Sequence, residues 1–160
     1  MSKFLEQFDL AVIERAHRHC LGATRWAFFI VYFWFGILKV LGFSPASPLV
    51  LALLAKTLPF IPPHAFMVGF GAFEVAVGVA FLIPHLERLA LGLLGAHLVT
   101  TLLPLLLLPS IAWQAPFVPT LEGQYIIKNV LMMALAANLA ARLRPLCRIP
   151  ASKKETPGTA

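Results

Sequence analysis

Residues 65–83 read AFMVGFGAFEVAVGVAFLI, a run of apolar residues with a single charged side chain, Glu74. A helix needs about 20 predominantly apolar residues to cross the hydrocarbon core of a bilayer. Three further stretches meet this requirement, at 23–42, 88–108 and 124–143. In the whole chain 59% of the residues are hydrophobic and 12% are charged, which is too apolar for a domain dissolved in water. We therefore predict an all-α membrane protein, a bundle of four transmembrane helices.

Lysine and arginine are distributed unevenly around the four spans. Short cytoplasmic segments of membrane proteins are enriched in both residues, and this enrichment sets the orientation of the chain. The segments before span one, between spans two and three, and after span four contain Lys3, Arg15, Arg18, Arg88, Arg144, Arg148, Lys153 and Lys154. The segments after spans one and three contain only Lys56. We predict a multi-pass protein with both termini cytoplasmic, and we attribute the net charge of +6 to topology rather than to nucleic-acid binding.

Two shorter helices are expected beside the spans, within a single domain covering residues 1–150. In residues 1–22 apolar and charged side chains recur at helical spacing, which predicts an amphipathic helix lying on the membrane surface. Ser47 and Pro48 are typical of a helix start, with Ser47 as the cap, and Pro59 of a helix end. The helix between them, of about eleven residues, is too short to cross a bilayer. We place it at the outer interface, between spans one and two.

The remaining segments carry no further helix signal. The loop 109–119 contains many prolines, so we predict no regular structure there. Residues 151–160 are polar and terminal, which predicts a disordered tail. Cys20 and Cys147 flank spans on the predicted cytoplasmic side and are not a C-x-x-C pair, so we expect free thiols.

Small residues indicate how the helices pack. In span two Ala72, Ala76 and Ala80 recur at every fourth position, and Gly92 and Ala96 have the same spacing in span three. Such stripes let helix backbones approach closely in lipid. We therefore predict helix contacts along both stripes.

Five polar residues of the spans are the candidate functional residues: Lys39, Glu74, His97, Lys128 and Asn129. An ionisable group at the bilayer centre costs about 2.5–3.5 kcal/mol on insertion scales, so each position calls for a physical reason. At a rise of about 1.5 Å per residue, Lys39 and Lys128 lie near the outer ends of their spans, and Glu74 and His97 near the midplane. This predicts a basic outer layer above a layer of acid and imidazole.

Two interpretations of these residues stay open. In the structural interpretation, the lysines extend to the outer headgroups and Glu74 pairs with one of them or with His97. In the functional interpretation, the polar residues bind a ligand or relay a proton, because a carboxylate at the midplane has no headgroup within reach.

Motifs for cofactors and for catalysis are scarce. A haem held by two histidines needs both at similar depth, and His97 is the only histidine near the middle of a span; a single-His site, or a His/Met pair with Met132 or Met133, is left open. No Cys/His ligand set, nucleophile motif or phosphate-binding loop occurs. We predict no metal and no intrinsic cofactor, and the motifs do not decide whether the chain is an enzyme.

Three segments resemble a known family: WFGILKVLGFSPASPLV at 34–50, GAFEVAVGVAFLIP at 71–84 and PTLEGQYIIKNVLMMALA at 119–136. In this order and spacing they are similar to the DoxX-like family of bacterial four-helix membrane proteins, over about residues 23–143. The resemblance implies a bacterial inner-membrane location. It also implies a redox-linked role, because the family takes its name from a subunit resembling the small membrane subunit of thiosulfate:quinone oxidoreductase.

Three functions follow from this combination. The leading hypothesis is a redox-linked accessory subunit that associates with a quinone or a lipid through its polar interior, and with a soluble or membrane redox protein as partner. The alternative is a non-catalytic assembly or stabilising protein whose polar residues fix the helix register. A small transporter is the third, and it would need an oligomer, since four helices are few to enclose a water path.

Overall fold

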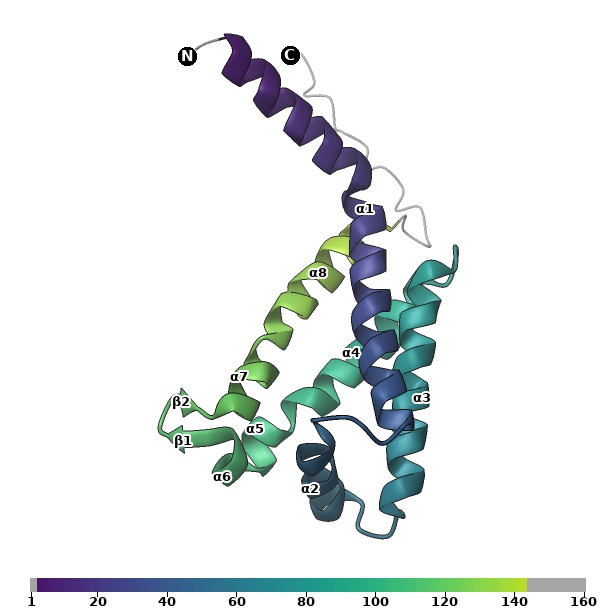
Figure 1. Ribbon diagram of the computed structural model, residues 1–160, viewed down its shortest axis with the longest axis vertical. Coiled ribbons are helices and arrows are strands. Elements are labelled where there is room, and N and C mark those ends of the chain that lie inside the picture. Colours follow the sequence, from purple (N-terminus) through teal and green to yellow (C-terminus); the bar gives the residue numbers. More distant parts are fainter. Residues whose placement is uncertain (1–2, 144–160) are drawn as a thin grey trace, which may run out of the picture.

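The computed structural model describes residues 3–143, which are mostly helical (Figure 1). The helices are α1 (Lys3–Val40), α2 (Ser47–Thr57), α3 (Pro63–Leu82), α4 (Glu87–Leu102), α5 (Pro104–Leu107), α6 (Pro109–Ala112), α7 (Leu121–Ile127) and α8 (Asn129–Ala141), with strands β1 (Trp113–Ala115) and β2 (Val118–Pro119). Four helical segments, 3–40, 63–82, 87–107 and 121–141, are long and apolar enough to cross a membrane. This confirms the four apolar helices predicted from the sequence. The predicted tail and Cys147 lie outside the described residues.

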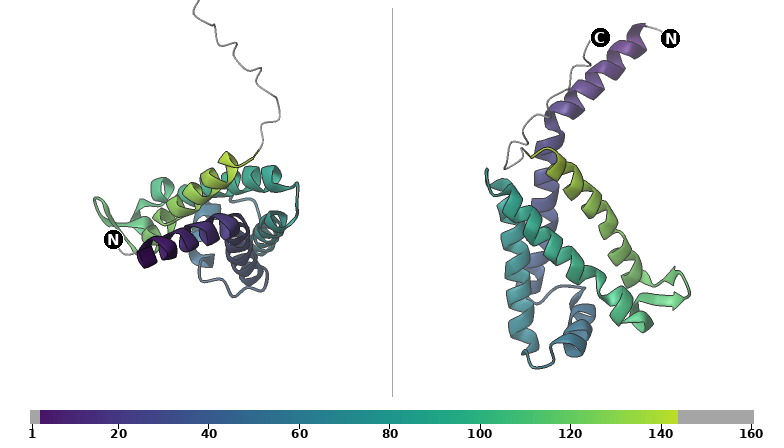
Figure 2. Two further views of the ribbon diagram at one scale, coloured as in Figure 1. Left: turned by 90° about the horizontal axis from the view of Figure 1, so that it is seen from above. Right: turned by 180° about the vertical axis from the view of Figure 1, so that it is seen from behind.

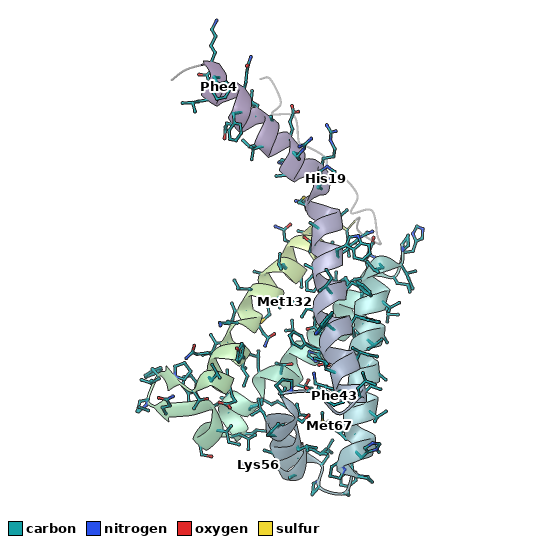
Figure 3. The ribbon with its side chains drawn as sticks, in the orientation of Figure 1. Phe4, His19, Phe43, Lys56, Met67 and Met132 are labelled. Carbon is teal, nitrogen blue, oxygen red and sulfur yellow. The ribbon has the colours of Figure 1, made fainter. Side chains whose placement is uncertain are left out.

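The predicted surface helix at 1–22 is wrong in its boundary, because it continues into the first span as part of α1. No proline interrupts residues 3–40, so the backbone hydrogen bonds run on without a stop. The 38 residues measure about 57 Å at the helical rise. The first part of α1 leans away from the rest, with the bend just after His19 (Figure 3). There Thr24 Oγ1 donates to the Cys20 carbonyl at 2.8 Å, a side-chain bond that often bends helices.

Glycines place the second half of α1 in backbone contact with α3 (Figure 1). A Cβ at Gly36 would lie 2.7 Å from the Gly71 carbonyl oxygen, and a Cβ at Gly78 would lie 2.9 Å from the Phe33 nitrogen. Both distances are shorter than side chains tolerate, so these positions need glycine. The hydrophobic core lies beside this contact, where Phe28 and Phe81 stack at 4.5 Å between ring centroids.

The prediction that the small-residue stripes make helix contacts is mostly wrong. Ala72, Ala76, Gly92 and Ala96 are exposed, whereas Ala80 is buried. Small residues lie on two faces of the second span, one with the alanines and one with Gly71 and Gly78. The glycine face allows the closer approach of another helix, because glycine has no Cβ.

At one end of the molecule α1 ends, α3 begins, and α2, α5, α6 and the strands gather; we call this the α2 end (Figure 1). The predicted short helix is confirmed at Ser47–Thr57, although Ala46 rather than Ser47 is its cap residue. Lys56 Nζ donates to the Leu107 carbonyl at 2.5 Å, which joins α2 to the last turn of α5. A cation at a helix C-terminus also interacts favourably with the helix dipole.

The prediction of no regular structure at 109–119 is wrong, because this segment forms α6 and a β-hairpin. Its prolines occupy positions that tolerate them: Pro109 starts α6, Pro116 lies in the turn, and Pro119 ends β2. Proline at 116 followed by Phe117 with a φ of 62° is the pattern of a type II turn. The prolines are therefore compatible with the hairpin, because each occupies a position where its missing N–H does not remove a needed hydrogen bond.

The other spans are less enclosed than α3. Seen from behind, α4 runs obliquely from the far end of α3 to α5, and α8 runs beside it at a similar slope (Figure 2). Leu139 of α8 is buried in the core, while Val130, Leu131 and Met133 are exposed. Most of the α8 surface is thus apolar and uncovered.

Candidate functional site

Glu74 lies at the centre of a buried polar network contributed by three helices. Its side chain is on α3 and only 4% exposed. Its Oε2 accepts a hydrogen bond from Lys39 Nζ of α1 at 2.6 Å, and its Oε1 lies 2.8 Å from His97 Nε2 of α4. Lys39 and His97 are buried as well. We call Lys39, Glu74 and His97, together with Tyr32 described below, the Glu74 network.

The glycine contact between α1 and α3 explains why Lys39 meets Glu74. Lys39 follows Gly36 by three residues, and Glu74 follows Gly71 by three residues. Residues three apart lie on the same face of a helix, so both side chains lie on the faces that make the glycine contact. Because α1 and α3 run antiparallel, Lys39 lies on the α2 side of this contact and Glu74 on the other side, and the long lysine side chain spans the offset to reach Glu74. An added Cβ at Gly71 would lie 2.9 Å from the Lys39 Cβ, which shows how close the two helices are here.

The hydrogen-bond chemistry of Glu74 decides the tautomer of His97. An ionised carboxylate only accepts hydrogen bonds, so beside it Nε2 of His97 is the donor; in a neutral imidazole Nδ1 is then the acceptor. Nδ1 lies 3.4 Å from the Tyr32 hydroxyl and 3.2 Å from Thr101 Oγ1. The Thr101 hydroxyl also lies 2.9 Å from the His97 carbonyl. Because the hydroxyl has one proton, it donates to either Nδ1 or the carbonyl at one time. With His97 neutral, the charges of Lys39 and Glu74 cancel within the network.

Aromatic rings surround the network. Phe70 and Phe73 stack on the His97 ring with centroid distances of 5.3 and 6.2 Å, and Tyr32 meets it edge-on at 5.1 Å. Lys39 Nζ lies 5.5 Å from the centroid of Phe70, a cation–π distance. Polar groups enclosed in this way interact more strongly than they would in water.

A half-open cleft of about 230 Å³ lies at the α2 end, between the end of α1, the start of α2 and the start of α3. Lys39, Ser47 and His64 are its polar lining residues. Its apolar lining includes Leu51 and Met67; Figure 3 shows Met67 on α3 beside α2. Because Lys39 belongs to both, the cleft adjoins the Glu74 network.

The structure unites three of the five candidate residues and leaves two apart. Lys39, Glu74 and His97 form one group, so Lys39 lies in the same layer as Glu74 rather than in a separate outer layer. Lys128 is exposed, with its Nζ 5.0 Å from the Tyr125 ring centroid. Asn129 donates to the carbonyls of Tyr125 and Ile126 at 3.3 and 3.2 Å, in its own helical segment.

Tyr32 is the network residue that the sequence reading missed. It precedes Gly36 by four residues and Lys39 by seven, so all three lie on one face of α1. The helical spacing was the available signal, but a tyrosine in an aromatic-rich span is equally expected in the core. Its 5% exposure and its contact with His97 identify it here.

Within residues 3–143, no three His, Cys, Asp or Glu side chains gather as they would around a metal ion. No family model, curated protein or solved structure matches the chain. The resemblance to the DoxX-like family therefore stays a prediction from the three motifs. The structure does give their residues physical roles: Gly36 allows the helix contact, Lys39 and Glu74 pair, and at Gly123 a Cβ would overlap the Ala112 carbonyl.

Proposed function

We propose that this chain is a four-helix protein of the bacterial inner membrane, with both termini cytoplasmic, that serves as a redox-linked accessory subunit. In this proposal the Glu74 network binds the polar end of a quinone or a lipid, and a redox protein of the same membrane or of the cytoplasm is the partner. The observation that carries the proposal is the buried ion pair of Lys39 with Glu74 at 2.6 Å, extended by His97 at 2.8 Å.

The energetics of buried charge support a role beyond packing. Replacing a buried ion pair by well-packed apolar residues is often neutral, or stabilising by about 1–4 kcal/mol. A bundle that needed only stability would have little use for three ionisable groups in its core. The Lys39 ammonium has three N–H donors, and Glu74 takes one of them, so Lys39 also has donors to offer a ligand.

The test is a binding titration of the purified protein in nanodiscs of uncharged lipid, with a short-chain benzoquinone as the probe. Glu74→Gln and Lys39→Met should weaken quinone binding about tenfold or more, the loss expected for one hydrogen bond to a charged group. Lys128→Met is the matched control, because this lysine is exposed and outside the network. The proposal is overturned if the wild-type protein binds neither the quinone nor a lipid probe.

A second candidate function, a non-catalytic assembly or stabilising protein, is favoured by a different observation. Both carboxylate oxygens of Glu74 already have partners, and the network adjoins the glycine contact of α1 with α3, so it could fix the register of these two helices. The double change Lys39→Met with Glu74→Gln would then alter stability and leave the activity of the partner intact. Loss of partner activity with an undisturbed fold would count against this candidate.

A further inference from the structure

The cleft at the α2 end is a cavity that reaches one member of the Glu74 network. Its lining comes from three elements: Lys39 at the end of α1, Ser47 and Leu51 on α2, and Met67 on α3. Lys39 lines the cleft and is 7% exposed, so a molecule in the cleft would touch a largely buried lysine. Glu74 and His97 are not among the cleft residues. Contact between a ligand and the network would therefore pass through Lys39.

The donors and acceptors of the lining define what would bind. Lys39 only donates hydrogen bonds, and it has N–H groups beyond the one that Glu74 accepts. The Ser47 hydroxyl donates to the Ser44 carbonyl at 2.8 Å, which uses its one proton. The third polar lining residue, His64, can donate or accept through its imidazole nitrogens, and no carboxylate lines the cleft. An oxygen that accepts a hydrogen bond is thus the ligand group that this lining recognises.

The charge of the neighbouring carboxylate decides between a neutral and an anionic oxygen. Lys39 is already neutralised by Glu74 at 2.6 Å. An anion bound to Lys39 would bring a second negative charge close to Glu74 in a poorly hydrated site, where like charges repel strongly. An uncharged carbonyl oxygen accepts the same hydrogen bond without this repulsion. The apolar lining residues, including Leu51 and Met67, suit an attached hydrocarbon chain.

We propose that the cleft between α1, α2 and α3 is a binding site for an uncharged, carbonyl-bearing amphiphile, whose carbonyl oxygen accepts a hydrogen bond from Lys39. This inference deepens the proposed function, on which it rests, by locating the site and naming the chemistry of the head group. A quinone ring and the ester of a neutral lipid share this chemistry. Leu51 and Met67, as apolar lining residues of the cleft, would then contact the hydrocarbon chain.

The experiment compares three probes on the full chain in nanodiscs of uncharged lipid: a short-chain benzoquinone, a short-chain diacylglycerol and the fatty-acid anion oleate. We expect the quinone or the diacylglycerol, whichever is the natural class, to bind about tenfold or more tightly than oleate. Tighter binding of oleate would overturn the assignment to an uncharged head group. Binding of the quinone alone, or of the diacylglycerol alone, identifies whether the natural ligand is a quinone or a neutral lipid.

Cleft-filling variants test the location. Met67→Trp should weaken binding of the preferred probe about tenfold or more, whereas Ala72→Trp, on an exposed face of α3, should leave it unchanged. If Met67→Trp does not fold, Leu51→Cys supplies the test: the bound probe should slow its reaction with a maleimide, after subtraction of the wild-type rate due to Cys20 and Cys147. Unchanged binding in Met67→Trp, or no protection of Leu51→Cys, overturns the location even where the wild-type protein binds the probe. Binding of neither quinone nor lipid overturns the proposed function itself.

Discussion

Glu74 shows at the scale of one residue how a carboxylate is held away from water. Each of its oxygens has a hydrogen-bond partner on a different helix, Lys39 on α1 and His97 on α4. Removing one partner of a buried ion pair costs about 3–5 kcal/mol, because the other charge is left without compensation. Removing both charges together avoids that cost. The pair therefore constrains which substitutions the core tolerates, separately from whether it adds net stability.

We expect Lys39→Met to lower the free energy of unfolding by about 3–5 kcal/mol, and Lys39→Met combined with Glu74→Gln to lower it by less. Equilibrium unfolding in mixed micelles measures both, and the two single variants with the double variant form a double-mutant cycle. Lys128→Met should be close to wild type. Strictly additive effects of the two single changes would show that Lys39 and Glu74 are not coupled.

Two contacts between elements depend on an atom that one residue type lacks: the Cβ that glycine lacks and the backbone N–H that proline lacks. Gly36 and Gly71 have no Cβ, which lets the backbones of α1 and α3 touch. Pro109 has no N–H, so it cannot donate to the Leu105 carbonyl four residues earlier. The Trp113 indole N–H donates to that carbonyl instead, at 3.0 Å. The hairpin is in this way attached to the end of α5.

Gly36→Ala should destabilise the protein by about 1–3 kcal/mol, the usual cost of forcing extra atoms into a packed contact. The new Cβ would meet backbone atoms of α3, which cannot rotate away as a side chain would. Gly92→Ala is the matched control, because a Cβ there meets nothing within 4 Å, and alanine is favoured over glycine in a helix by about 1 kcal/mol. Thermal unfolding in detergent compares them. Equal stability of the two variants would refute the backbone contact.

Trp113→Phe should cost about 1 kcal/mol, because the Leu105 carbonyl loses its donor while most of the ring volume stays. Hydrogen exchange or limited proteolysis at the hairpin should show faster local opening than in the wild type. Trp26→Phe, at an exposed position on α1, is the control for the loss of an indole. No change in hairpin protection would argue against this bond.

Within residues 3–143, most charged residues lie at the end opposite to α2. The arm of α1, the turn between α3 and α4, and the end of α8 all lie there (Figure 1). Arg25 on α1 forms an ion pair with Glu87 at the start of α4. The α2 end instead exposes Phe43, Phe60 and Phe117, and aromatic residues are enriched at membrane interfaces. This distribution supports the proposed orientation, in which the α2 end faces outward.

Cysteine labelling of cells checks the orientation. In a background with Cys20→Ser and Cys147→Ser, a membrane-impermeant maleimide should label Phe117→Cys in intact cells. It should label His85→Cys, in the turn between α3 and α4, only after the membrane is permeabilised. The reverse pattern would invert the proposed topology, and labelling of both sites in intact cells would contradict a membrane crossing by the segment 87–107.

Hydropathy and proline positions along the chain are enough to predict the four apolar helices, the short helix at Ser47–Thr57 and the ionisable groups among apolar residues. These are local properties, because each is set within one segment. The inward turn of Lys39 to Glu74, the exposure of Lys128, and the contact through Gly36 and Gly71 instead of the alanine stripe follow from the packing of the helices. Such choices depend on how each helix is rotated about its axis, which is set by its contacts with residues distant in the chain. For Lys39, the reach of a long side chain allowed a headgroup or a buried carboxylate, and the close approach of α1 to α3 selected the carboxylate.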